Sequence, residues 1–213
     1  VGGLLGLVPM VRNPALIRQL RQPWQIWLLG VGGLFGYHFF YFTALRNAPP
    51  VEASLVAYLW PLLIVIFSAL LPGEKLRPHH LFGALLGLLG AALIVTAGQG
   101  VSFRAEYGVG YAAALICALT WSGYSLLSRR FSAIPTAAVT GFCLVTAALA
   151  AICHVLLEQT VWPATPLQWA ATLGLGLGPV VLAFYAWDPG VKHGDIQVLG
   201  AASYSAPPLS TVI

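Results

Sequence analysis

The residues best suited to bind a small molecule lie around two prolines inside apolar segments. Tyr58 and Trp60 lie just before Pro61. Tyr204 lies at the same spacing before Pro207. A proline inside a helix removes one backbone hydrogen bond, and in a membrane the freed carbonyl group must be satisfied by neighbouring protein or by water in a cavity. Each proline alone could be a packing kink, but two in matching places favour a polar cavity that holds a substrate.

Other aromatic side chains lie deep in the apolar segments, away from the tryptophans at segment ends that are typical of the membrane interface. Tyr and Trp offer a flat apolar face and one polar group, and the ammonium group of an amino acid can lie over such a ring. No Lys or Arg lies in the middle of a segment to hold a strong anion, so a flat, uncharged or zwitterionic solute fits better. Some of these rings will only pack or face lipid. The candidate substrate-binding residues are His38, Tyr41, Tyr58, Trp60, Trp121, Tyr124, Tyr185, Trp187 and Tyr204.

His38 is the one ionisable side chain well inside an expected span. It lies one helical turn before Tyr41 and on the same face. It can serve as a hydrogen-bonding contact between helices or as a donor or acceptor in the pocket. We expect Asp and Glu only at helix starts and in loops, with Asp188 in a turn, and this pattern argues against a carboxylate proton relay.

The composition is that of a membrane protein. Of 213 residues, 59% are hydrophobic and 8% are charged, against about 25% charged residues in soluble domains. The net charge of +4 is too small to indicate nucleic-acid binding. The three cysteines lie in apolar runs without metal-ligand spacing, so we expect reduced thiols, no metal and no cofactor.

Spans of about 20 apolar residues alternate with short polar loops along the chain. Eight of the ten Lys and Arg residues fall in alternate loops, at 12–23, 72–80, 128–132 and 188–195. By the positive-inside rule, these loops are cytoplasmic. We predict an all-α polytopic fold with six complete spans, at 24–45, 51–71, 81–97, 109–127, 133–157 and 167–187, and two partial ones, at 1–11 and from 196 onward.

A shift of 146 residues superimposes the two halves of the chain. Tyr58 then coincides with Tyr204, and Pro61 with Pro207. Strict identity is low, and glycine-rich apolar helices can match by chance. We interpret the match as an internal repeat, with residues 1–97 as the first copy and 98–213 as the second.

The orientation of the two copies follows from the number of spans between them. The corresponding spans 24–45 and 167–187 lie five positions apart in the order of spans. An odd offset reverses the direction of crossing, so the copies are inverted relative to each other. Inverted repeats are typical of secondary transporters, which bind substrate near the middle of the membrane between the halves.

Several further motifs resemble one known family. A helix proline, a Gly-Glu turn and a glycine-spaced helix follow one another, and an aromatic motif and an Arg pair mark the next helix. The residues are Pro61, Gly73-Glu74, Gly83, Gly87, Gly90, Trp121-Ser122-Gly123-Tyr124 and Arg129-Arg130. Together they resemble the EamA-type drug/metabolite transporters, and the density of aromatic residues is similar to that of the bacterial aromatic amino-acid exporters. The resemblance implies ten spans in two inverted five-helix repeats, so that the first span, part of the second, part of the ninth and the tenth would lie outside this sequence.

We therefore expect a secondary transporter of small metabolites in the bacterial inner membrane, not an enzyme. It would export aromatic amino acids or similar flat solutes by alternating access around a central aromatic-lined cavity. Its expected partners are a small-molecule substrate and the lipid bilayer, with no nucleic acid; a homodimer is left open. The alternative is a membrane-embedded lipid-modifying enzyme, which would need paired mid-span acids, a Ser–His pair or an HExxH motif. A channel would need small polar residues along one helix face.

Overall fold

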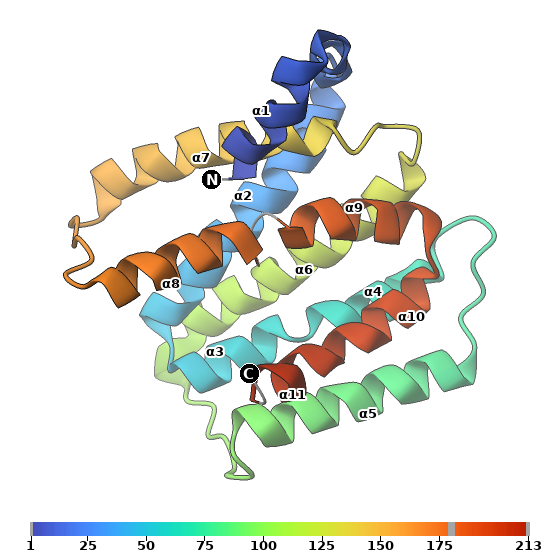
Figure 1. Cartoon of the computed structure of the whole chain (residues 1–213). Coiled ribbons are helices and arrows are strands. Elements are labelled where there is room, and N and C mark those ends of the chain that lie inside the picture. Colours follow the sequence, from blue (N-terminus) through green and yellow to red (C-terminus); the bar gives the residue numbers. More distant parts are fainter. Residues whose placement is uncertain (1, 179–181, 212–213) are drawn as a thin grey trace. The chain divides into compact units, whose positions relative to one another are not determined.

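The computed structural model describes residues 2–178 and 182–211, and within these ranges all regular structure is helical (Figure 1). Five helical segments are long and apolar enough to cross a membrane, which confirms the prediction of an all-α membrane protein. They are Trp24–Asn47, Pro50–Ser68, Pro78–Val95, Ala105–Arg130 and Ala138–Leu157.

The membrane-length segments contain six of the labelled helices. These are α2 (Trp24–Asn47), α3 (Pro50–Ala57), α4 (Trp60–Ser68), α5 (Pro78–Val95), α6 (Gly108–Arg130) and α7 (Ala138–Leu157), with α3 and α4 forming one segment. The shorter helices are α1 (Gly2–Arg12), α8 (Pro166–Leu177), α9 (Ala183–His193), α10 (Ile196–Ala202) and α11 (Ala206–Ser210), with 3-10 turns η1 (Pro14–Leu20), η2 (Ala105–Tyr107) and η4 (Ser203–Ser205).

Local sequence explains where several helices begin. Proline occupies the first turn of α3, α4, α5 and α8, where its missing N–H costs nothing and its fixed φ suits a helix. Thr165 and Gln168 form a capping box at the start of α8. The Asp195 side chain accepts hydrogen bonds from the N–H groups of Gln197 and Val198 at the start of α10, so its carboxylate satisfies two otherwise unpaired donors.

The predicted span at 167–187 includes residues outside the described part of the chain, so it stays a prediction. This stretch contains α8, which ends at Leu177, and the first residues of α9, while residues 179–181 lie outside the described part of the chain. Helix α9 also continues to His193, beyond the expected turn at 188.

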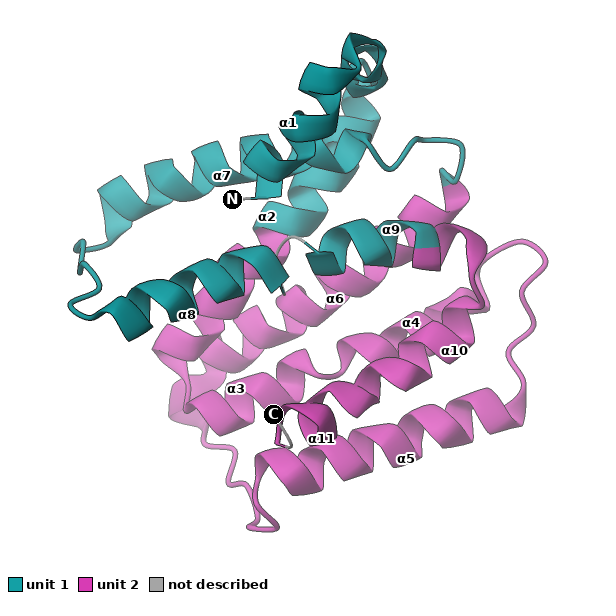
Figure 2. Ribbon diagram, viewed as in Figure 1, with its two compact units in different colours: residues 1–35, 131–189 teal, residues 36–130, 190–213 magenta. Residues whose placement is uncertain are grey.

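The chain forms two compact units, shown in teal and magenta in Figure 2. Unit 1 contains residues 1–35 and 131–189, and unit 2 contains residues 36–130 and 190–213. In unit 1, the Trp27 ring meets the Phe142 ring edge-on, with centroids 5.5 Å apart. Within unit 1, then, the beginning of α2 packs against α7.

In unit 2, α4 and α10 pack side by side in opposite directions (Figure 1). The Leu62 N–H, early in α4, donates to the Tyr204 hydroxyl just after α10, at 3.2 Å. The Gln197 amide, early in α10, donates to the Ser68 hydroxyl at the end of α4, at 2.9 Å. Because one residue number falls as the other rises, the two helices are antiparallel.

Small residues allow the helices of unit 2 to approach closely. A Cβ added at Gly200 of α10 would lie 3.1 Å from the Pro61 carbonyl oxygen in α4. A buried cluster of six alanines and one cysteine joins the end of α2, α3 and α6, as is common between helices in membranes. The residues are Ala44, Ala48, Ala53, Ala57, Ala113, Ala114 and Cys117.

Replacing Gly87 by alanine will destabilise the protein. The new Cβ would lie 2.6 Å from Cδ2 of the Tyr204 ring, and overpacking of this kind costs about 1–3 kcal/mol. Gly83→Ala, on the same helix with nothing within 4 Å of the added Cβ, is the matched control. Thermal unfolding in detergent should show a lower midpoint for Gly87→Ala alone; equal midpoints for the two variants would contradict the packing.

Candidate functional site

An aromatic cluster in unit 2 is the candidate binding site. Trp121 of α6 lies at its centre: the centroid of its ring is 5.1 Å from that of Tyr37, 5.3 Å from that of Tyr124 and 6.3 Å from that of Trp60. Tyr37 in turn stacks on Tyr41, with centroids 6.1 Å apart and the rings nearly parallel. The cluster therefore consists of Trp121 and four further rings. Three of them, Tyr37, Tyr124 and Trp60, lie next to Trp121, and Tyr41 lies next to Tyr37.

The outer members of this cluster keep part of their surface exposed. Trp121 and Tyr124 are buried, whereas Tyr37, Tyr41 and Trp60 are half-buried. The hydroxyl groups of Tyr37, Tyr41 and Tyr58 lie close enough to interact electrostatically. The half-buried residues thus offer a solute both apolar ring faces and phenol hydroxyl groups.

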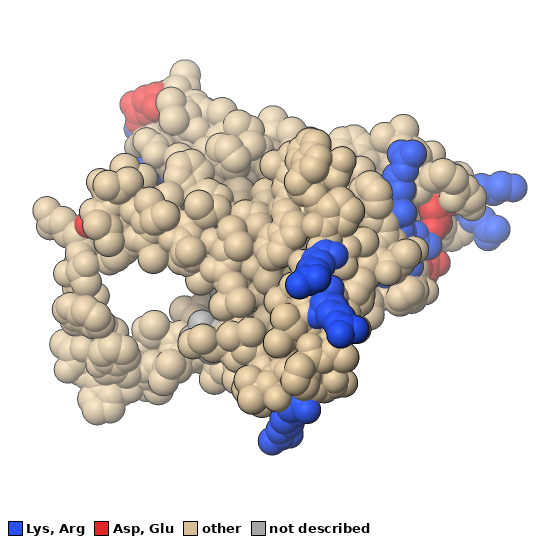
Figure 3. All heavy atoms as spheres, turned by 90° about the horizontal axis from the view of Figure 1, so that it is seen from above, with Lys and Arg blue, Asp and Glu red and all other residues tan. Residues whose placement is uncertain are grey.

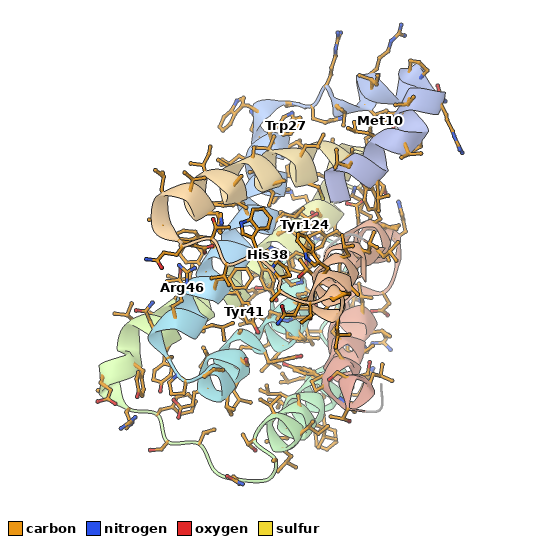
Figure 4. All side chains as sticks on the ribbon, turned by 60° about the vertical axis from the view of Figure 1, so that its left-hand side comes forward. Met10, Trp27, His38, Tyr41, Arg46 and Tyr124 are labelled. Atoms are coloured by element: carbon orange, nitrogen blue, oxygen red, sulfur yellow. The ribbon has the colours of Figure 1, made fainter. Side chains whose placement is uncertain are left out.

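Helix α2 carries Tyr37, His38 and Tyr41. Figure 4 shows His38 and Tyr41 between Trp27 and Arg46 along α2. The His38 ring is half-buried, with its centroid 5.2 Å from the Tyr37 ring. Tyr37 was not among the candidate residues, although its spacing of one turn from Tyr41 is the signal that could have identified it.

The chain is interrupted at both prolines. Helix α3 ends at Ala57 and α4 begins at Trp60, and α10 ends at Ala202 with α11 beginning at Ala206. Tyr58 and Trp60, both candidate residues, therefore flank the first break directly.

The side chain of Tyr204 hydrogen-bonds to the backbone on both sides of the first break. Its hydroxyl donates to the Tyr58 carbonyl oxygen at 3.0 Å and accepts from the Leu62 N–H at 3.2 Å. Protein therefore satisfies these two backbone groups of the break, as a membrane environment requires. The structure places Tyr204 against the backbone of α4 and leaves its contact with a substrate as a prediction.

Two further candidates, Tyr185 and Trp187, belong to α9 in unit 1. The Tyr185 hydroxyl is hydrogen-bonded to that of Thr140 at 2.7 Å. Their proposed contribution to a shared cavity with the aromatic cluster of unit 2 remains a prediction.

Asp188 corrects one expectation from the sequence. It lies inside α9 instead of in a turn, it is buried, and it accepts a hydrogen bond from the Thr136 hydroxyl at 2.7 Å. A buried carboxylate is therefore present within a helix, so the argument against carboxylate-mediated proton movement is weaker than the sequence suggested.

At one end of unit 2, Arg129 joins three segments that are far apart in the sequence. Its guanidinium donates to the carbonyl oxygens of Val191 at 3.0 Å and Gly194 at 2.7 Å, and it forms an ion pair with Glu74. Gly73 has a φ of +84°, a left-handed conformation that favours glycine, and it forms the turn that presents Glu74. The sequence showed both residues as motif members without showing this contact.

These contacts agree with the grouping of loops by charge. Glu74, Arg129 and Gly194 come from, or lie beside, three of the loops rich in Lys and Arg, and they meet. Near the other end of α6, Tyr111 donates a hydrogen bond to Glu52 in the first turn of α3. Most of the face shown in Figure 3 carries neither Lys or Arg nor Asp or Glu, as expected of a lipid-facing protein.

The arrangement favours binding over covalent chemistry. The cluster offers rings and hydroxyl groups, which can hold a flat solute by stacking and hydrogen bonding. Among the described residues, no group of three or more His, Cys, Asp or Glu could hold a metal ion.

Helices of membrane length and an aromatic cluster beside a broken helix are the features of a multi-pass α-helical transporter. The sequence matches the EamA-like transporter family over residues 1–96 and 108–213. The chain belongs to this family, as its motifs indicated.

Known relatives agree with this assignment. The aromatic amino acid exporter YddG of Ancylobacter novellus is 56% identical over 214 residues, which is 100% of this chain and 74% of that protein. The proteins of the same name in Salmonella typhimurium and Escherichia coli are each 27% identical, over 76% of this chain and 57% of theirs. A solved crystal structure, 56% identical, has a TM-score of 0.93 and covers 99% of this chain and 72% of its own. The chain thus spans just over half the length of the two enterobacterial relatives.

Removing the Arg129 side chain will lower stability more than removing the charge of Glu74. Arg129→Ala loses all three interactions and leaves the carbonyl groups of Val191 and Gly194 without this cation, at a cost of about 2 kcal/mol. Glu74→Gln leaves the two carbonyl contacts in place and should cost less than about 1 kcal/mol. The exposed neighbour Arg130→Ala is the control.

Thermal unfolding in detergent measures this order directly. Arg129→Ala should have the lowest midpoint, Glu74→Gln an intermediate one, and Arg130→Ala that of the unaltered protein. A midpoint for Arg129→Ala equal to that of Arg130→Ala would show that the contacts contribute nothing.

Proposed function

We propose that the chain is part of a secondary transporter that exports aromatic amino acids or similar flat solutes across the bacterial inner membrane. The family match supports a transporter over an enzyme. The observation that carries the substrate class is the ring cluster around Trp121, in a chain 56% identical to a protein named as an aromatic amino acid exporter.

The chemistry of the cluster fits this class of solute. Stacked or edge-on ring pairs contribute about 0.5–1.5 kcal/mol each beyond the burial of apolar area, so a site with several half-buried rings selects an aromatic side chain over an aliphatic one. A zwitterionic amino acid also brings an ammonium group, which binds over ring faces, and a carboxylate, which can accept hydrogen bonds from phenol hydroxyl groups.

Alternating access between two inverted five-helix repeats is the proposed mechanism. Its support is the antiparallel packing of α4 against α10, because the shift of 146 residues places the α3–α4 segment on the α10–α11 segment. Equivalent helices run in opposite directions when the repeats that contain them are inverted. The family match in two segments, 1–96 and 108–213, fits repeats at 1–97 and 98–213.

The membrane-embedded enzyme has no comparable support. Arg129 and Tyr204, two polar side chains with defined partners, hydrogen-bond to backbone carbonyl groups. The transporter is therefore the only function we propose.

Counterflow in liposomes tests the proposal. Liposomes that contain the full-length chain are loaded with unlabelled L-tryptophan. They should accumulate labelled L-tryptophan, L-phenylalanine and L-tyrosine in a saturable way. L-lysine and L-glutamate are the controls and should not accumulate. Equal uptake of all five, or none of any, would refute the proposed substrate class.

Trp60→Ala will weaken binding of the aromatic solute. Loss of one half-buried ring of the cluster should raise KM about tenfold, which corresponds to about 1.4 kcal/mol, and Trp60→Phe should lie between. Trp24→Ala is the matched control, because Trp24 is 69% exposed at the start of α2. If both alanine variants keep the original KM, the cluster is not the binding site.

A further inference from the structure

The Tyr204 hydroxyl takes the place of one backbone hydrogen bond between α3 and α4. In an uninterrupted helix, the Leu62 N–H would bond directly to the Tyr58 carbonyl four residues earlier. Here the hydroxyl lies between the two groups, 3.0 Å from the carbonyl oxygen and 3.2 Å from the nitrogen. A phenol has only one proton to donate, and in this state that proton is committed to the Tyr58 carbonyl.

The surroundings hold Tyr204 in this position. The ring is 4% exposed and lies against Gly87 of α5, where any larger residue would collide with it. Gly200 brings α10 within contact of the Pro61 carbonyl of α4. Two glycines, on two different helices, thus provide the close approach that places the hydroxyl in the break.

The break is also connected to the aromatic cluster. Tyr58, whose carbonyl receives the hydrogen bond, lies in the break just before Trp60. Trp60, two residues later, meets Trp121 edge-on. A change in the backbone between these two residues therefore changes how both rings are presented to a solute.

We propose that Tyr204 is a positioning residue for transport and that its hydroxyl is a reversible insertion in the α3–α4 helix. With the hydroxyl inserted, the helix is interrupted and α10 is attached to it. When the hydroxyl leaves, the Tyr58 carbonyl accepts directly from the Leu62 N–H, so the helix closes and neither backbone group is left unpaired. Movement of α10 is thereby coupled to the rings at the binding site. This inference rests on the proposed function.

Tyr204→Phe tests the insertion because it removes the hydroxyl and keeps the ring that packs on Gly87. In liposomes containing the full-length chain, the maximal rate of L-tryptophan transport should fall at least fivefold. KM, and the thermal stabilisation by L-tryptophan, should stay within twofold of the original values. Tyr107→Phe is the matched control: its hydroxyl accepts from the exposed Arg104 at 2.6 Å outside the site, and its rate should be unchanged.

Two results would overturn the proposal. An unchanged maximal rate in Tyr204→Phe would show that the insertion has no part in transport. A raised KM with an unchanged rate at saturating substrate would make Tyr204 a substrate contact instead.

A distance measurement gives a readout that does not depend on transport. Spin labels at the exposed positions 51 and 70, in a background without the native cysteines, report the length of the α3–α4 segment. Tyr204→Phe should shift the distance distribution, and Tyr107→Phe should not. An unchanged distribution contradicts the insertion. If the shift occurs but the unaltered protein carries no aromatic solute, the proposed function fails and the insertion stands.

Discussion

The organisation of unit 2 depends on the need to satisfy backbone groups inside a membrane. A proline at position 61 interrupts the helix, and lipid offers no partner for groups exposed by such a break. The Tyr204 hydroxyl supplies both an acceptor and a donor at this point. It can do so because Gly87 and Gly200 let its ring and its helix approach closely. One long-range contact therefore explains a proline, a tyrosine and two glycines that are otherwise separate features.

The candidate site follows from the same break. Trp60, just after the break, carries a ring that meets the Trp121 ring of α6 edge-on. Away from these rings, Glu52 and Arg129 form polar contacts near opposite ends of α6. Polar contacts thus lie near both ends of α6, and the rings of Trp121 and Tyr124 lie between them.

Much of this fold could be predicted from sequence because its signals are local. Apolar length, loop charge and motif spacing depend on neighbouring residues, and they gave the helical membrane fold and the family. The partner of the proline break could not be predicted, since Tyr204 lies far along the chain from Tyr58 and no local rule pairs them. Asp188 was expected in a turn, whereas α9 continues through Pro189 to His193. The predicted span at 167–187 includes residues 179–181, outside the described part of the chain, and stays a prediction.

The most direct measurement is an experimental structure of the full-length chain with bound L-tryptophan. The account predicts the indole ring within about 4 Å of the side chains of Tyr58 or Trp60, beside the break in the α3–α4 helix. Density for the ligand that touches neither side chain nor any other ring of the Trp121 cluster would contradict it.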